Sequence, residues 1–459
     1  MKVKTRIAPS PTGLFHIGNA RTALFSYLFA KKNHGEFLLR IEDTDIERSK
    51  KEYEEDIIAG LKWLGLVWDG EITRQRDRSP RHRECLEKLL AENKAFYCRH
   101  TPDELAREQK NQELGKIPFK HDCDHKNNPA GHSGVIRLKN PKKKIIFNDL
   151  IRGEIVFESE LLGDMVLAKD LDTPLYNFAV VVDDADMEIT HVIRGEDHLS
   201  NTPKQILIQE ALELKRPEYA HLPLILSPDR SKLSKRHGGT SVTEYKNMGY
   251  LPQALLNLMA LMGWHPTTNQ EIFSLEELIK EFDLDRVQKA GAVFNKDKLD
   301  SINQHYIKQL VPAELAGYLA PYLTQYNPNQ EQLIKVAHLF QNRLNKFSEI
   351  KELAAFIFDI PKYPPDLLIW KNSSAEKTKD NLETALMVLE KVAESSFDID
   401  ATTTELMPAA NKIGRGELLW PLRVALSGLE KSPGPFEIME VLGRSESISR
   451  IKKAIERIK

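Results

Sequence analysis

The chain has 459 residues, of which 41% are hydrophobic and 29% are charged, and its formal net charge is −2. The chain is too long to form a single compact hydrophobic core, so we predict two to four domains. The balance of hydrophobic and charged residues excludes a disordered chain. With three cysteines, no apolar segment of membrane length and no apolar leader, the sequence predicts a cytoplasmic protein without disulfides and without a membrane partner.

The first elements predict a nucleotide-binding α/β unit. A weakly alternating strand spans Lys4–Ala8, and the loop Pro9–Gly13 separates it from a helix pattern that begins near Gly18. An apolar strand follows at Glu36–Ile41 and ends in the polar run Glu42–Asp45. Strand, glycine loop, helix and strand in this order are typical of the opening of a parallel nucleotide-binding fold.

The middle and the rear of the chain differ in character from this opening. Short strand-like runs between Cys98 and about Asp170 predict an inserted α+β module, and Phe178–Val182 then predicts a further strand. Cys85 lies on the apolar face of a predicted helix and is expected in the core. Beyond about Thr240 the apolar spacing is helical. We therefore predict a Rossmann-like α/β half with an α+β insertion, followed by an all-α half.

His16 lies in a loop directly ahead of a predicted helix, within the run RIAPSPTGLFHIGNAR that begins at Arg6. Backbone N–H groups and the helix dipole favour an anion such as phosphate there. Gly13 and Gly18 let a ligand approach the backbone, and a histidine can donate hydrogen bonds to oxygens that gain charge in a transition state. Alone, the short HIG string is more typical of an ordinary turn with a surface histidine.

A second cluster of charge follows about two hundred residues later. Four cations lie within Arg230–Arg236, and Lys232 and Lys235 are three residues apart with Ser234 between them. Such a loop can close over a triphosphate and neutralise departing pyrophosphate. Alone, a lysine-rich loop is more typical of a solvated basic surface.

Together the two motifs resemble the signatures of class I aminoacyl-tRNA synthetases, which usually read HIGH and KMSKS and here read HIGN and KLSKR. The flanking sequence narrows this resemblance to bacterial glutamyl-tRNA synthetases, through the runs RIAPSPTG, RIEDTD, THVIRGEDHLSNTPKQ, HLPLILS, GYLPQALLN, AGAVFNKDKLD and WPLRVALSG. The resemblance extends over nearly the whole chain. It departs at Asn19, which can donate a hydrogen bond but cannot carry the proton charge of a second histidine.

The resemblance implies a ligase that activates L-glutamate with ATP and Mg²⁺ and transfers it to the 3′ end of tRNA(Glu). The α-carboxylate is ionised at neutral pH and needs no general base, so positioning and charge stabilisation carry the catalysis. The expected catalytic residues are His16, Asn19, Lys232, Ser234 and Lys235. The expected glutamate contacts are Arg6, Ala8, Ser10, Glu42, Tyr176 and Arg194. The expected ATP contacts are Pro9, Thr12, Gly13, His16, Gly18, Asn19, Asp197, Lys232, Leu233, Ser234, Lys235 and Arg236.

Cys98-x-His100 and Cys123-x-His125 form two pairs of metal-type ligands. Two cysteines and two histidines suit tetrahedral zinc, and one intervening residue places both members of a pair on one side of an extended strand. The resemblance adds that zinc-bearing members carry a cysteine/histidine site at this place, so we predict a structural Zn²⁺. Nearby rival ligands are His121, Asp122 and Asp124.

The resemblance also implies five domains, with the catalytic domain split by an insertion that binds the tRNA acceptor end. The expected ranges are 1–97 (catalytic, first half), 98–190 (insertion), 191–240 (catalytic, second half), 241–312 (helical stem contact) and 313–459 (anticodon-binding). The rear arginines Arg415, Arg423, Arg444 and Arg450 fit either RNA contacts or contacts within the protein. A monomer without a DNA partner is expected, and the choice between tRNA(Glu) alone and both tRNA(Glu) and tRNA(Gln) stays open.

Four other classes of protein compete with this interpretation. Glutaminyl-tRNA synthetases resemble RFPPEPNG at the first motif and have a β-barrel rear half, whereas this chain has RIAPSPTG and helices. A glutamate-transferring tRNA-modifying paralogue resembles the front half alone. A small nucleotidylyltransferase lacks KLSKR followed by long helical domains, and a non-catalytic RNA-binding protein has no need of two phosphate loops.

Overall fold

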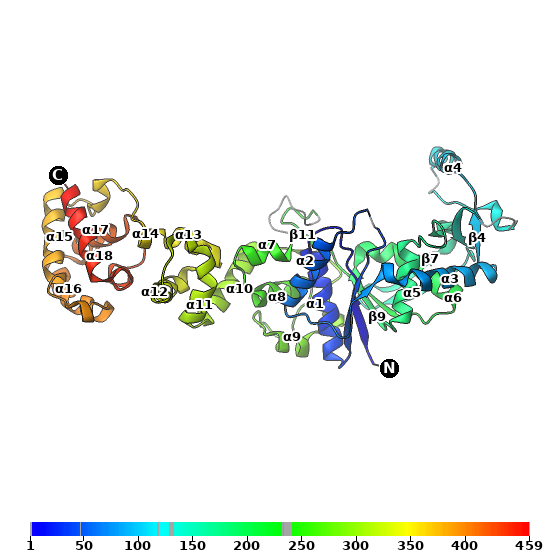
Figure 1. The fold of residues 1–459 in the computed structure, drawn as a ribbon, viewed down its shortest axis with the longest axis horizontal. Coiled ribbons are helices and arrows are strands. Elements are labelled where there is room, and N and C mark those ends of the chain that lie inside the picture. The colour runs from blue at the N-terminus through cyan, green and yellow to red at the C-terminus, as the bar shows by residue number, and fades with distance from the viewer. Residues whose placement is uncertain are drawn as a thin grey trace. The chain divides into compact units, whose positions relative to one another are not determined.

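The structure, a computed structural model, describes residues 2–45, 47–116, 119–127, 133–231, 233 and 241–458 (Figure 1). The chain forms two compact units. The first contains the residues up to Lys246 together with Leu251–Leu299, and the second contains Asn247–Tyr250 and the residues from Asp300 on. No helix in the described part of the chain has the length and apolar character that crossing a lipid bilayer requires.

Parallel strands form the centre of the first unit. One sheet has the order β1-β2-β3, and a second has the order β7-β6-β10-β9, in which only β7 is antiparallel to its neighbour. Their bounds are β1 (Lys4–Ile7), β2 (Glu36–Ile41), β3 (Thr73–Arg74), β6 (Lys144–Asp149), β7 (Gly153–Glu158), β9 (His191–Gly195) and β10 (Glu218–Leu222). The N–H of Thr190 donates to the carbonyl of Lys4 at 3.0 Å, which places β9 beside β1.

Helices and two smaller sheets complete the first unit. The helices are α1 (Ile17–Lys32), α2 (Lys51–Trp63), α3 (Ser79–Ala91), α4 (Pro102–Leu114), α5 (Tyr176–Asp186), α6 (Thr202–Leu212), α7 (Val242–Asn247), α8 (Pro252–Leu261) and α9 (Leu275–Glu281). The smaller sheets contain β4 (Ala95–Cys98), β5 (Val135–Leu138) and β8 (Val166–Ala168), and β11 (Ile225–Leu226) with β12 (Ala292–Val293).

The run Phe178–Val182 is not a strand, as the sequence predicted, but the middle of helix α5. All five of its residues are buried. The prediction was wrong because an apolar run that is buried on every side has no periodicity to separate strand from helix, and three consecutive valines favoured a strand.

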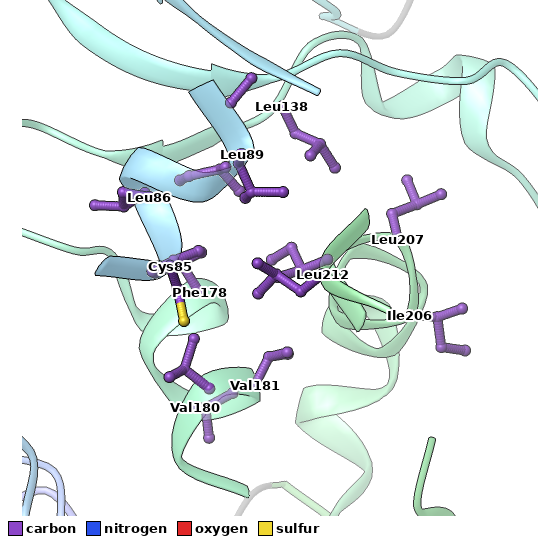
Figure 2. Close-up of a cluster of buried hydrophobic side chains, with 14 of the residues drawn as sticks. Cys85, Leu86, Leu89, Leu138, Phe178, Val180, Val181, Ile206, Leu207 and Leu212 are labelled. Carbon is purple, nitrogen blue, oxygen red and sulfur yellow. The ribbon is translucent and has the colours of Figure 1, made fainter. Parts of the chain in front are cut away.

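Helix α5 belongs to a buried apolar cluster that fixes one side of the unit. In Figure 2, Phe178, Val180 and Val181 of α5 lie with side chains of α3 and α6, among them Leu86 and Leu212. Cys85 lies in the same cluster and is 4% exposed. The expectation that Cys85 is a core residue is therefore confirmed.

The second unit is helical throughout its described elements. The chain passes into it within α10 (Lys296–Gln309). Its further helices of seven residues or more are α11 (Pro312–Leu319), α12 (Gln330–Phe340), α15 (Ala375–Leu389), α16 (Ile399–Ile413), α17 (Arg415–Ser427) and α18 (Pro435–Arg457). The predicted fold class, a Rossmann-like half with an insertion and then an all-α half, is confirmed.

Candidate active site

A cavity of about 640 Å³ opens in the first unit where β1 and β9 end and α1 begins. Parallel α/β sheets bind ligands at this place, because the loops beyond neighbouring strand ends leave a crevice. The predicted site residues that line it are Arg6, Ala8, Pro9, Ser10, Thr12, His16, Gly18, Asn19, Glu42, Tyr176, Arg194, Asp197 and Leu233. Gly13 is not among the lining residues. Lys232, Ser234, Lys235 and Arg236 lie outside the residues that the structure describes.

His16 caps the N-terminus of α1 at the mouth of this cavity. Its Nδ1 accepts the N–H of Gly18 at 3.0 Å. A neutral imidazole that accepts at Nδ1 carries its proton at Nε2, so the other edge of the ring is a donor. No acidic side chain lies in the first turn of α1. The helix start therefore favours an anion, as the sequence predicted for this segment.

Two buried arginines share one carboxylate beside the cavity. Arg6 donates to Asp184 from Nε at 3.0 Å and from Nη2 at 3.3 Å. Arg40 donates from Nη1 to Asp184 at 2.6 Å and from Nη2 to Glu42 at 3.0 Å. Burial acts to raise the pKa of Asp184, but Arg40 and Arg6 outweigh it and lower that pKa. For Glu42, burial outweighs the pull of Arg40 and raises the pKa.

Arg194, near the end of β9, is held by a chain of buried polar groups. Its Nε donates to His221 Nε2 at 3.1 Å, and its Nη2 donates to Thr202 Oγ1 at 2.7 Å. His221 Nδ1 lies 2.6 Å from Asp149 Oδ2, which assigns the proton to Nδ1 and leaves Nε2 as the acceptor. Burial lowers the pKa of His221, so the ring is neutral at neutral pH.

The remaining guanidinium nitrogen of Arg194 is the feature that points to a ligand. Nη1 is buried and has no hydrogen-bond partner among the described residues. Buried polar groups are normally paired, so an unpaired donor in a cavity wall indicates a missing acceptor. A planar guanidinium fits a carboxylate at such a place.

Tyr176 begins α5 and closes another side of the cavity. Its hydroxyl lies 3.1 Å from Nδ1 of His198, which also lines the cavity. Burial raises the pKa of Tyr176 to about 12 and lowers the pKa of His198 to about 4. Both side chains are therefore uncharged at neutral pH, and the hydroxyl donates to the ring nitrogen.

Sequence reasoning missed part of the cavity wall and the scaffold behind it. Arg21, on α1, lines the cavity and donates to the carbonyls of Met262, at 3.1 Å, and of Pro223. Burial lowers the pKa of Arg21 to about 10. Its place two residues after HIGN was a usable signal. Nothing local connects Asp149 with His221, which lie 72 residues apart in the chain.

The predicted metal ligands lie together beyond the end of β4. Cys98 Sγ and Cys123 Sγ each lie 3.5 Å from Nδ1 of His100. His121 approaches from the other side, with Nε2 3.6 Å from Cys98 Sγ. The ligand atoms of these four residues all lie within 4.8 Å of one another, so two sulfurs and two nitrogens fit one tetrahedral zinc. A second grouping contains His100, Cys123, Asp124 and His125.

Comparison with known proteins agrees with this architecture. Residues 2–301 match the family of tRNA synthetases class I (E and Q), catalytic domain, and residues 314–455 match an anticodon binding domain. The fold is thus that of a class I tRNA synthetase. The glutamate–tRNA ligase of Aquifex aeolicus is 44% identical over 100% of this chain and 99% of its own length. Glutamate–tRNA ligase 2 of Thermoanaerobacter pseudethanolicus is 41% identical, over 99% and 98%. The chain belongs to the glutamate–tRNA ligase family.

Solved structures give the same result. A crystal structure of a glutamate tRNA ligase from Elizabethkingia meningosepticum in complex with its amino acid is similar with a TM-score of 0.89 and 34% identity, over 100% of both chains. The glutamate-tRNA synthetase of Elizabethkingia anophelis has a TM-score of 0.88 and 34% identity, over 99% of this chain and 100% of its own. The resemblance inferred from the motifs is confirmed at the level of the whole fold.

Proposed function

We propose that this chain activates L-glutamate with ATP and transfers it to the 3′ end of tRNA(Glu). The observation that carries the proposal is the buried, unpaired Nη1 of Arg194 in the wall of a cavity that also contains the helix start of α1. A carboxylate on the amino acid would supply the acceptor that Arg194 lacks. Membership of the family supports the same substrate, because its named relatives are glutamate–tRNA ligases.

The charges around Arg194 favour glutamate over glutamine. Among the described residues, Arg6 and Arg40 form ion pairs with Asp184 and Glu42, whereas Arg194 has no carboxylate partner. The side-chain carboxylate of glutamate would pair with this guanidinium, whereas glutamine would offer it only a neutral amide oxygen. Replacing a charge-assisted hydrogen bond by a neutral one costs about 1–2 kcal/mol, which corresponds to a discrimination of about 5- to 30-fold.

The other end of the amino acid needs a partner for its ammonium group. Glu42 lines the cavity and is held by Arg40, so it can face a cation without losing its position. Ser10 and Ala8 line the same side, where a hydroxyl and a carbonyl accept hydrogen bonds. Tyr176 provides the apolar wall along which the methylene groups lie. These roles extend the predictions made from the sequence.

ATP would bind at the start of α1. His16 Nε2–H would donate to an α-phosphate oxygen, and Gly18 and Asn19 would bring the first helical turn to the phosphates. Lys232 and Lys235 are proposed for the β- and γ-phosphates on the sequence alone. The described residue between them, Leu233, lines the cavity, and its N–H donates to the carbonyl of Ile225 at 3.1 Å.

The proposed reaction has two steps. An α-carboxylate oxygen of glutamate attacks the α-phosphorus of ATP, the bond to the bridging oxygen breaks, and pyrophosphate leaves. A ribose hydroxyl at the tRNA end then attacks the acyl carbon, AMP leaves, and the hydroxyl proton passes to the departing phosphate. Mg²⁺ bound with ATP would shield phosphate charge. The protein contributes orientation and the His16 donor at the α-phosphate.

The proposal includes partners and organisation that follow from family membership. The anticodon-binding match over residues 314–455 supports tRNA contact by the second unit. We further propose a cytoplasmic monomer, a structural Zn²⁺ at the cysteine/histidine cluster, and the five-domain division at 97, 190, 240 and 312. Charging of tRNA(Gln) is left to the assay.

A charging assay tests this function. The purified protein is incubated with ATP, Mg²⁺ and labelled glutamate or glutamine, on separately transcribed tRNA(Glu) and tRNA(Gln). Glutamate charging on tRNA(Glu) alone would support the proposal in its discriminating form, and charging on both tRNAs would add tRNA(Gln) as a substrate. Glutamine charging, or no charging of tRNA that a reference synthetase can charge, would overturn it.

A further inference from the structure

Helix α4 has no buried residue that would anchor it to the rest of its unit. It has a proline in its first turn and a capping box between Thr101 and Glu104, yet none of its residues is buried. Leu114 is 76% exposed. In Figure 1, α4 (cyan) lies apart from α3, α5 and α6. A 13-residue helix without a buried face is marginal in water, so a specific attachment must hold it.

One face of α4 attaches the helix to the segment that follows it. Leu105, Glu108 and Gln112 are its half-buried positions and recur at helical spacing. Gln112 exchanges two hydrogen bonds with the backbone of Lys120, each of 2.8 Å. Glu108 Oε2 lies 2.5 Å from Nδ1 of His121. The carboxylate–imidazole contact is thus the charged part of the attachment.

His121 points its other nitrogen at the cysteines. Nε2 lies 3.6 Å from Cys98 Sγ, while Nδ1 carries the proton that Glu108 accepts. The backbone around it is fixed: Asp164 N–H donates to His121 O at 2.7 Å, and Asp164 Oδ2 accepts the N–H of Cys123 at 2.8 Å. His121 is 5% exposed. This combination of an outward carboxylate and an inward nitrogen is the usual arrangement of a metal-binding histidine.

His125, the ligand predicted from the sequence, is less suited to the same role. Its Nδ1 is the atom that faces Cys123 Sγ, at 3.6 Å, but the same nitrogen accepts the N–H of Arg99 at 3.3 Å. The single lone pair of a neutral imidazole cannot serve both a backbone N–H and a metal. His125 is also half-exposed, whereas His121 is buried.

We infer that His121 completes a Cys₂His₂ zinc site with Cys98, His100 and Cys123, and that zinc binding docks α4 through Glu108. Zinc draws electron density from Nε2 and makes Nδ1–H a stronger donor to the carboxylate. Binding of the metal and ordering of the helix therefore stabilise each other. The inference is independent of the charging activity, because metal content and helix protection report it.

Zinc affinity separates the two histidines. The full-length protein, His121→Ala and His125→Ala are stripped of metal and titrated with Zn²⁺ against a chromophoric chelator. We expect one zinc in the wild type and His125→Ala with affinities within about threefold, and a loss of more than about 100-fold in His121→Ala. Zinc retained by His121→Ala but lost by His125→Ala, or no zinc bound by the wild type, would overturn the assignment.

Two further measurements test the proposal even if His121→Ala fails to fold. They also test whether zinc binding docks α4. Glu108→Gln keeps every proposed ligand, and we expect it to bind zinc about 10- to 100-fold more weakly, with Glu113→Gln, on the exposed side of α4, as the matched control. Hydrogen exchange of residues 102–114 should accelerate at least about tenfold when the wild type loses zinc. Equal exchange with and without zinc would refute the docking step.

Discussion

Two buried arginines, one in each unit, show opposite states of the same side chain. Arg194 in the cavity is 5% exposed and has an unpaired Nη1. Arg450 on α18 is 3% exposed, and its guanidinium is fully engaged. Its Nη1 donates to the carbonyls of Phe356 and Leu426 at 2.7 Å each, its Nη2 donates to Ile357 O at 2.9 Å, and its Nε donates to Glu446 at 2.7 Å.

The two guanidinium groups differ in their hydrogen bonding. Arg194 keeps one donor that a ligand could use, whereas Arg450 uses its donors to hold helices of the second unit together. The carbonyls that Arg450 binds lie in the last turns of α17 and of the short helix α14 (Ala355–Phe358), where helices present unpaired acceptors. Arg444 likewise donates to the carbonyls of Val392 and Glu390, both at 2.8 Å. Of the two roles left open for the rear arginines, contact within the protein therefore applies to Arg450 and Arg444.

The largest effect is expected at Arg194. We predict that Arg194→Leu lowers kcat/KM for glutamate by about 1,000-fold, because a buried charge partner of the substrate is lost at about 4 kcal/mol. Thr202 Oγ1 lies 3.1 Å from His221 Nε2 and keeps that partner, so the free energy of unfolding should change by less than about 1 kcal/mol. Steady-state charging and urea unfolding measure the two quantities. A glutamate KM and kcat within threefold of wild type would contradict the role of Arg194.

At Arg450 we predict the reverse: a loss of stability without a loss of glutamate binding. Arg450→Met leaves three buried carbonyls unpaired and should lower the free energy of unfolding of the second unit by about 3 kcal/mol. The glutamate KM of the folded protein should stay within twofold, because the cavity is built by the first unit. Denaturant unfolding and charging on the same preparation test this, with Arg450→Lys as the variant that regains part of the stability. Unchanged stability would show that the bonds to the carbonyls contribute nothing.

A smaller effect is expected from the scaffold of Arg194. Thr202→Val removes the acceptor of Nη2 without changing the volume, and we expect the glutamate KM to rise about tenfold with kcat changed less than threefold. Thr202→Ser keeps the hydroxyl and serves as the matched control. An equal rise in both variants would mean that packing, not the hydrogen bond, positions Arg194.

The smallest effect is expected at an exposed arginine of the second unit. Arg415 donates from Nε to Asn411 at 3.0 Å and is otherwise exposed to solvent. We predict that Arg415→Gln raises the KM for tRNA about threefold at low salt and less at high salt, as for a phosphate contact. Stability should change by less than about 0.5 kcal/mol. A KM for tRNA that is independent of this residue at low salt would exclude the contact.

The sequence predicted the fold where signals are local and failed where they are not. The glycine loop before α1 and the polar residues after β2 are short-range patterns, and both predictions led to the cavity. Helix α5 was mistaken for a strand because its burial on all sides is a property of the tertiary structure.

Site prediction shows the same limit. The motifs contain Arg194, Thr202 and His221, but Asp149, which holds the His221 ring, comes from another part of the chain. The cysteine/histidine spacing located the metal cluster, whereas the contact of Glu108 with His121 and the hydrogen bond from the N–H of Arg99 to His125 are visible only in three dimensions. The lysines of KLSKR stay a sequence-based prediction, outside the described residues.

Strand β6 has a consequence for how this protein can be re-engineered. It belongs to the range predicted as the insertion, yet it pairs with β10 and ends at Asp149, behind Arg194. Arg152, three residues on, donates to the carbonyl of His221 at 3.2 Å. A chimera that exchanges residues 98–190 with a relative would therefore replace Asp149 and Arg152, which hold His221 behind Arg194. A grafted module should keep Asp149 and Arg152, so that His221 still holds Arg194 in place.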